Sequence, residues 1–409
     1  MKTNKGLEDE IMQKVFKYFR ESFDCNGLDS LNLNLNCSEE ELVNVICSLI
    51  NEDKLKIISF EHDENPHINR FGFPSKEMQI SYLQKKGMDG SFCIYPSNTY
   101  LQRNMETDLI PKYPFQYMIQ QGNPQLKECY FEWGVLYKYF SDPRYKFDFS
   151  DYIGHIESTD SIDDNSFIDL KTFGIGKDVN GNRVVVSYPR YLRHMSSACQ
   201  IEWYSKMVPN QEGCKVLRSY ANNLFSGCWK FPQTVYRSII QEISNINQLT
   251  SKIWNYNFFR TEFDKDKPVG FDMIYIPTYN VYMDYVLLLE KIVISNIDDK
   301  FFDVIKWPRY DDKGNLKKSL ICLSEFLQKV TPNVKDEIMI PLKGVRKLRQ
   351  NPAHKIEKNS YNIDYLNQQH ELTAKVFNSL LLLREVFQTH PWAKDCKIKY
   401  HNTEGYIVP

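Results

Sequence analysis

The chain has 409 residues, of which 42% are hydrophobic and 25% charged, and its 51 basic side chains nearly balance its 52 acidic ones. This composition is typical of a globular protein with two or three domains. The 26 Tyr, 25 Phe and 6 Trp exclude a disordered chain, because such side chains supply large buried areas. A net charge of −1 excludes a protein that binds nucleic acid through its overall charge, so any such binding must come from a local patch.

Ten cysteines are spread along the chain without a C-x-x-C pair. This spacing predicts buried, reduced thiols and no zinc site. The N-terminus lacks the apolar segment of a signal peptide, and the most apolar stretch, Met273 to Ser295, is interrupted by Pro277, Asp284, Glu290 and Lys291. We therefore expect a cytoplasmic protein with no membrane partner.

The N-terminal region, residues 1–88, begins with two predicted helices. Apolar side chains recur at helical spacing over residues 7–23. Ser38 and Glu41 have the spacing of a capping box, and a core stripe follows them. The run from Lys54 to Phe60 then predicts a strand.

A hydrated loop from His62 to His67 and a short strand near Ile68 to Phe71 complete an outline that is similar to a winged-helix domain. The second helix, which would read DNA in such a domain, carries carboxylates that phosphates would repel. We therefore expect a protein contact or a scaffold role in place of DNA reading. The carboxylates are Glu39, Glu40, Glu41, Glu52 and Asp53.

Residues 89–230 predict an α+β middle domain. Asp178 to Asn182 contains Asn-Gly and lies between two strand-like runs, Phe167 to Phe173 and Arg183 to Tyr188, which predicts a β-hairpin. The acidic stretch from Asp148 to Asp169 is expected to be a solvated loop, with the hypothesis that it shields a basic segment elsewhere in the chain.

Residues 231–409 predict an all-α bundle of four or five helices, so the fold class is a multidomain, mainly α chain with an α+β middle. Apolar residues recur every three or four positions along the long segments, and Pro332 and Pro341 are expected to break the shorter ones. The expected helices cover residues 235–256, 279–297, 318–330, 342–351 and 361–390.

A basic segment lies between the last two predicted helices of the bundle. From Lys343 to Lys358 there are six cations and one acid, Glu357. A neutral protein that concentrates charge in this way is expected to bind a phosphate-bearing partner. His354 lies inside the segment, where nearby cations would lower its pKa and let the neutral imidazole act as a base.

Arg349 and His354 are separated by four residues, and here the sequence resembles the HEPN superfamily, all-α domains that include ribonucleases with an R-x4–6-H motif. The resemblance covers roughly the last third of the chain. A second pair, Arg384 and His390, also fits the spacing, but Arg384 is expected to lie in a core-facing helix. Two features depart from the family pattern: Gln350 replaces the commoner Asn, Asp or His, and Pro352 bends the segment.

The resemblance implies a metal-independent endoribonuclease that needs no cofactor. The 2′-hydroxyl of the RNA would attack the adjacent phosphate and leave a 2′,3′-cyclic phosphate. Arg349 would neutralise the developing charge and His354 would carry the proton. In the family two motifs usually face each other across a homodimer, here through the C-terminal bundle. The expected RNA contacts are Arg346, Lys347, Gln350, Asn351, Lys355 and Lys358.

The resemblance also suggests a role as a toxin or as an anti-phage abortive-infection effector. The expected partners are RNA, either tRNA or mRNA, and a regulatory protein or phage trigger. Other interpretations remain open. The bundle would then be a non-catalytic RNA-binding or dimerisation module, with Arg349 and His354 capping helices and pairing with carboxylates, or the chain would be a winged-helix transcriptional regulator.

Overall fold

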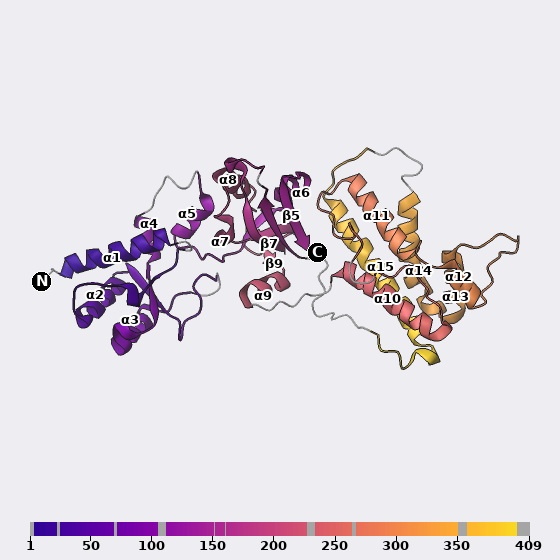
Figure 1. The fold of residues 1–409 in the computed structure, drawn as a ribbon, viewed down its shortest axis with the longest axis horizontal. Coiled ribbons are helices and arrows are strands. Elements are labelled where there is room, and N and C mark those ends of the chain that lie inside the picture. Colours follow the sequence, from indigo (N-terminus) through magenta and orange to yellow (C-terminus); the bar gives the residue numbers. More distant parts are fainter. Residues whose placement is uncertain are drawn as a thin grey trace. The chain divides into compact units, whose positions relative to one another are not determined.

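The chain divides into two compact units, Met1–Cys228 and Trp229–Pro409 (Figure 1). The division lies close to residue 231, where the sequence predicts the start of the bundle. The chain is mainly helical, with a sheet-containing region in the middle. The computed structural model describes residues 4–22, 25–68, 72–104, 112–150, 152–159, 161–226, 234–263, 267–350 and 358–398.

The first unit opens with helices around a three-stranded antiparallel sheet of order β1-β3-β2. The elements are α1 (Asn4–Glu21), β1 (Leu28–Asp29), α2 (Glu39–Asn51), β2 (Leu55–Ser59), α3 (Lys76–Lys86), β3 (Phe92–Pro96), α4 (Asn98–Arg103) and α5 (Pro114–Gln120).

Both faces of this sheet are buried. Successive strand residues point to opposite sides, and each side packs in its own core. Ile57 and Ile94 join a core with apolar side chains of α1, α2 and α3. Their neighbours Ile58 and Cys93 join a second core that includes Ile119 of α5. The sheet is therefore enclosed by helices that come before and after it in the chain.

The predicted capping box at the start of α2 is confirmed. The Glu41 backbone N–H donates to Ser38 Oγ at 3.2 Å, and the Ser38 N–H donates to Glu41 Oε2 at 3.4 Å. Glu39 and Glu40 lie in the same first turn, where the helix dipole favours negative charge. These carboxylates therefore stabilise the helix start.

Part of the expected N-terminal outline is wrong. The strand that pairs with β2 is β3, and not the segment near Ile68, which forms one parallel bridge to Leu126. The expected boundary after residue 88 therefore cuts through one sheet. The rest of that expected strand, residues 69–71, lies outside the described residues. α3 was not predicted because its only buried side chains are Gln79 and Leu83, which leaves a weak apolar periodicity.

The middle region contains a second antiparallel sheet of order β4-β8-β7-β6-β5, with β9 also pairing to β7. This mixture of strands and short helices agrees with the predicted α+β character. The elements are β4 (Cys129–Glu132), α6 (Tyr137–Ser141), β5 (Tyr145–Ser150), β6 (Ile153–Ser158), β7 (Asp169–Lys177), β8 (Arg183–Ser187), α7 (Pro189–Leu192), α8 (Ser197–Ser205), β9 (Lys215–Val216) and α9 (Arg218–Ser226).

The predicted hairpin is confirmed as β7 and β8. Its turn is held by Asp178, whose Oδ1 accepts the N–H groups of Asn180 and Asn182, and Gly181 has the positive φ of 83° that the turn requires. The acidic stretch is only in part the expected loop, because Asp148, Glu157 and Asp169 lie on strands whereas Asp163 and Asp164 lie in the connection between β6 and β7. The Glu157 carboxylate on β6 lies 3.5 Å from the Lys146 ammonium on β5. This cross-strand ion pair neutralises one negative charge of the acidic stretch. Asp151 and Asp160 lie outside the described residues.

The second unit is built of helices packed around α14 and α15. α15 packs on α10 and α14, and α14 also packs on α11 and α13 (Figure 1). The described part of this unit contains no regular strand, only isolated bridges. The helices are α10 (Val235–Trp254), α11 (Tyr279–Val293), α12 (Asp299–Val304), α13 (Ser319–Val330), α14 (Pro332–Gln350) and α15 (Asp364–Gln388).

The expected break at Pro341 is wrong, whereas Pro332 does separate α13 from α14. Pro341 lies inside α14, which runs for 19 residues. A proline in a helix removes one hydrogen bond. The helix continues because one apolar stripe packs on both sides of Pro341, through Ile338 and Met339 before it and Leu342 and Val345 after it.

The nine cysteines of the described residues are free thiols, five of them buried and four partly buried, while Cys228 lies outside those residues. Among the helices of the described segments, each is too short or too polar to cross a bilayer.

Candidate functional site

The basic segment occupies the second half of α14. Because Leu342 and Val345 turn inward, the helical period places Lys343 and Lys347 on the opposite, exposed face, with Arg346 half-buried beside them. Within the described residues, these three cations form no ion pair. Lys347 and Arg349 also lie in the last turn, where the helix dipole favours positive charge.

Arg349 is anchored by a buried carboxylate. Its Nη1 donates to Oε1 of Glu290 on α11 at 3.3 Å. The Glu290 side chain is only 1% exposed, whereas that of Arg349 is 44% exposed. The other carboxylate oxygen of Glu290 accepts the Ser295 hydroxyl at 2.9 Å. Glu290 therefore holds one side of the guanidinium, and the exposure of Arg349 leaves room for a second partner.

The structure brings four of the predicted site residues together. Arg346, Lys347, Arg349 and Gln350 share the last turns of α14, where the side chain of Gln350 is exposed. Lys358 is also exposed, at the first described residue after α14. Three other predicted site residues lie outside the described residues: Asn351, His354 and Lys355.

In the second Arg-His pair, Arg384 is part of the core and His390 is half-buried beyond the end of α15. Arg384 Nε donates to Glu242 Oε2 at 2.8 Å, and the two side chains are 7% and 1% exposed. His390 Nδ1 accepts the Trp392 N–H at 3.3 Å, and its ring lies 5.6 Å from that of Trp254. The expectation that Arg384 faces the core is confirmed, and both residues have structural partners.

Glu290 is not predicted from the sequence as a partner of Arg349. In the sequence it is visible only as an interruption of the most apolar stretch of the chain. An acid within an apolar helix face is itself a signal, because a buried carboxylate requires a cation or hydrogen-bond donors. The sequence pattern does not identify the cation that pairs with Glu290.

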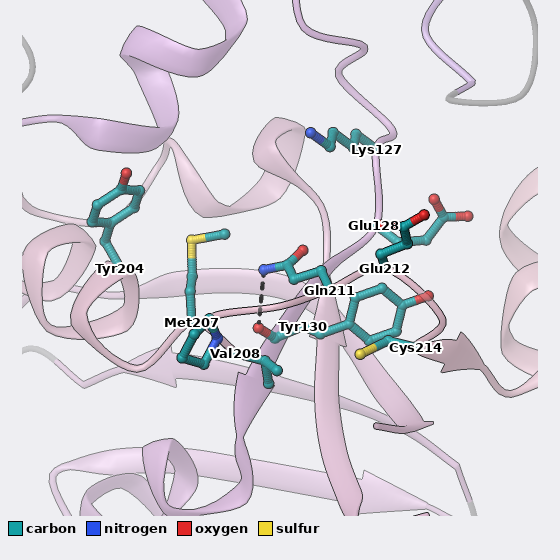
Figure 2. Close-up of a pocket in the computed structure, with 10 residues that line it drawn as sticks. Lys127, Glu128, Tyr130, Tyr204, Met207, Val208, Gln211, Glu212 and Cys214 are labelled. Atoms are coloured by element: carbon teal, nitrogen blue, oxygen red, sulfur yellow. Dashed lines mark hydrogen bonds between the residues drawn. The ribbon is translucent and has the colours of Figure 1, made fainter. Parts of the chain in front are cut away.

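An open pocket of about 830 Å³ lies beside β4 in the middle region (Figure 2). Its wall is the segment that follows α8 and runs along β4: Val208 N–H donates to the Tyr130 carbonyl at 2.9 Å, and Gln211 Nε2 donates to the same oxygen at 3.4 Å. Cys214 lines the pocket, but burial raises the pKa of its thiol. The thiol donates to the Asn210 carbonyl at 3.7 Å, and the described lining residues include no histidine.

Comparison of the chain with protein-family models, with curated proteins and with solved structures found no match.

Proposed function

We propose that the chain is a metal-independent endoribonuclease of the HEPN type, with its site at the C-terminal end of α14. The observation that carries this proposal is the setting of Arg349. This guanidinium is held by the buried Glu290 and is 44% exposed. Lys343 and Lys347 precede it on the exposed face of the same helix. A cation held by a carboxylate beside two exposed cations suits a reacting phosphate that must be both bound and oriented.

The chemistry uses only groups of the RNA and of this chain. The 2′-hydroxyl loses its proton to a base and its oxygen forms a bond to the adjacent phosphorus. The bond from phosphorus to the 5′-oxygen breaks, and that oxygen takes up a proton from an acid. Arg349 would neutralise the phosphorane, and His354 would serve as base or acid, with a second copy in a homodimer supplying the other role. The products are a 2′,3′-cyclic phosphate and a 5′-hydroxyl.

The remaining cations of the segment would position the RNA backbone. Contacts to phosphates fix the register of a nucleic acid without reading its sequence. Arg346 and Lys347 suit this role because they lie within one turn of Arg349 on α14. Gln350, Asn351, Lys355 and Lys358 complete the proposed contact set.

In this proposal the first unit senses or regulates and the second unit cleaves. The biological role would be that of a cytoplasmic toxin or of an anti-phage abortive-infection effector. A regulatory protein or a phage component would release the activity, and tRNA or mRNA would be the target.

A second candidate is a non-catalytic RNA-binding or dimerisation module. The ion pair between Arg349 and Glu290 favours it, because such a pair can serve the bundle alone. In that case RNA would bind with the salt dependence of a basic patch and would not be cut.

The test is RNA cleavage by the purified full chain in excess EDTA, with analysis of the product ends. The proposal predicts 2′,3′-cyclic phosphate ends and loss of cleavage in Arg349→Ala and in His354→Ala. Lys375→Ala is the matched control, because Lys375 is an exposed cation on α15 that pairs with Glu371 at 2.6 Å. Unchanged cleavage in either site variant would refute the site, and binding without cleavage by the wild type would favour the second candidate.

A further inference from the structure

One buried glutamine of the first unit differs from the other buried glutamines of the described chain. Gln79, Gln200 and Gln369 each use both ends of their amide to bond backbone groups. Gln125 is 1% exposed, and neither its Nε2 nor its Oε1 has a hydrogen-bond partner. A buried donor and acceptor without partners destabilise a protein, so a group that bonds both of them is expected to be missing.

Gln125 is one of the residues that line a cavity of about 30 Å³. Tyr95, Leu101 and Ile119 form part of its apolar wall, and His67 and Phe73 also line it. The backbone around Gln125 is fixed, because its carbonyl accepts the Arg190 N–H at 3.0 Å and the next N–H, that of Leu126, donates to the His67 carbonyl at 2.8 Å. The cavity has room for two water molecules or for one group of carboxamide size.

An open groove of about 600 Å³ adjoins this cavity, and Asn98, Gly122, Asn123 and Pro124 line both. The groove adds Gln102, Tyr117 and Gln121. Among the described residues that line the cavity or the groove there is no Asp, Glu, Lys or Arg. Four carboxamide side chains thus line the groove, and Gln125 lines the adjoining cavity.

Gly122 lines both the cavity and the groove, and its lack of a side chain leaves room beside Asn98 and Leu101. It has a positive φ of 79°, and a Cβ on this residue would lie 2.7 Å from Asn98 Oδ1 and 3.0 Å from Leu101 Cδ1. Any side chain here would be strained and would press on two residues that line the cavity.

We propose that the cavity and groove form a binding site for a nucleobase, whose edge enters the cavity and bonds Gln125 while the attached sugar lies in the groove. The Gln125 amide offers a donor beside an acceptor, and nucleobase edges present the complementary pair, as in the bidentate contact of Gln or Asn with adenine. The apolar and aromatic wall suits a flat ring, and the described lining residues include no Lys or Arg that would favour an anion as the group that enters. The base belongs either to a free nucleoside or to a single-stranded RNA.

The test is calorimetric and thermal-shift binding to the full chain with adenosine, guanosine, cytidine and uridine, and with the four matching unpaired tetranucleotides. At least one nucleoside or tetranucleotide should bind with saturation and raise the melting temperature. Binding of a nucleoside identifies a free ligand, whereas binding of a tetranucleotide alone identifies an RNA strand. Both results support the proposal, and neither requires that the chain cleave RNA.

Gln125→Met separates ligand recognition from stability. Replacing an unpaired buried amide by an apolar group of similar size should leave the melting temperature of the free protein unchanged or higher, while binding weakens by about tenfold or more. Gln79→Met is the matched control: it should lower the melting temperature by several degrees and keep the binding. Asn98→Ala, at an exposed position in the groove, should weaken binding without affecting the fold. The proposal is overturned if no nucleoside or tetranucleotide binds, in which case the cavity holds water only, or if Gln125→Met binds as the wild type does.

Discussion

Two arginines of the helical unit share one sequence pattern and have opposite environments. Arg384 and its partner Glu242 are 7% and 1% exposed and are 2.8 Å apart. Arg349 and its partner Glu290 are 44% and 1% exposed and are 3.3 Å apart. Both arginines precede a histidine at the spacing of the HEPN motif, but one guanidinium is enclosed by the core whereas the other reaches solvent.

This difference shows that the spacing between an arginine and a histidine does not by itself define a site. The environment of the arginine decides whether a phosphate can reach it. A buried arginine whose bonds go to Glu242 and Gln388 has no access to a phosphate. An arginine held by one buried carboxylate is oriented and still accessible. We therefore expect replacements in the Arg384 pair to lower stability and, under the proposed function, replacements in the Arg349 pair to lower RNA cleavage.

The largest expected effect on stability comes from Arg384→Met. The variant leaves the carboxylate of Glu242 buried without its cation, which should lower the free energy of unfolding by about 3 to 5 kcal/mol. Urea denaturation of the full chain measures it. The double variant Arg384→Met with Glu242→Leu should recover most of the loss, and a single variant as stable as the wild type would contradict the core role of this pair.

Arg349→Lys should separate stability from cleavage. The lysine keeps the positive charge near Glu290, so we expect the free energy of unfolding to change by less than about 1 kcal/mol. It lacks the planar fork that binds a phosphate bidentately, so the rate of RNA cleavage should fall by about 100-fold, or about 2.7 kcal/mol in the barrier. Single-turnover cleavage in EDTA measures the rate. A lysine variant that cleaves at the wild-type rate would show that the fork is not used.

Glu290→Gln tests whether the buried carboxylate orients Arg349. The amide keeps the shape and can still accept a hydrogen bond, but it lacks the charge that holds the guanidinium. Cleavage should fall by about tenfold, with little change in RNA affinity. Binding and single-turnover rates measured on the same preparation distinguish the two effects. A loss of affinity without a loss of rate would place Glu290 in binding instead.

The smallest effect is expected from the exposed lysines of α14. Lys343→Ala and Lys347→Ala should each reduce the slope of log affinity against log salt by about 0.7 for single-stranded RNA, because each removes about one phosphate contact. Lys375→Ala should leave the slope unchanged. If all three variants kept the salt slope of the wild type, α14 would not be part of the RNA-binding surface.

The long bundle helices could be predicted because a broad apolar stripe repeats every three or four residues along α10 and α15, whereas α12, with only six residues, is too short to show such a repeat. The hairpin of β7 and β8 could be predicted because Asn180 and Gly181 favour its turn. α14 was expected to start only after Pro341, because local propensity does not include the packing of Ile338 and Leu342 that carries the helix through the proline.

Contacts between distant segments could not be predicted. The pairing of β2 with β3 and the ion pair of Arg349 with Glu290 each join residues far apart in the sequence, and periodicity alone contains no information on such partners. The unpaired amide of Gln125 is likewise visible only in three dimensions, because a lone glutamine in a loop carries no sequence signal.

The most direct measurement of the central claim compares His354→Ala with His390→Ala in EDTA-resistant RNA cleavage. The account predicts that His354→Ala loses cleavage and the 2′,3′-cyclic phosphate ends, whereas His390→Ala retains both because His390 only caps a turn and packs on Trp254. Cleavage that survives in His354→Ala, or that is lost in a folded His390→Ala, would contradict it.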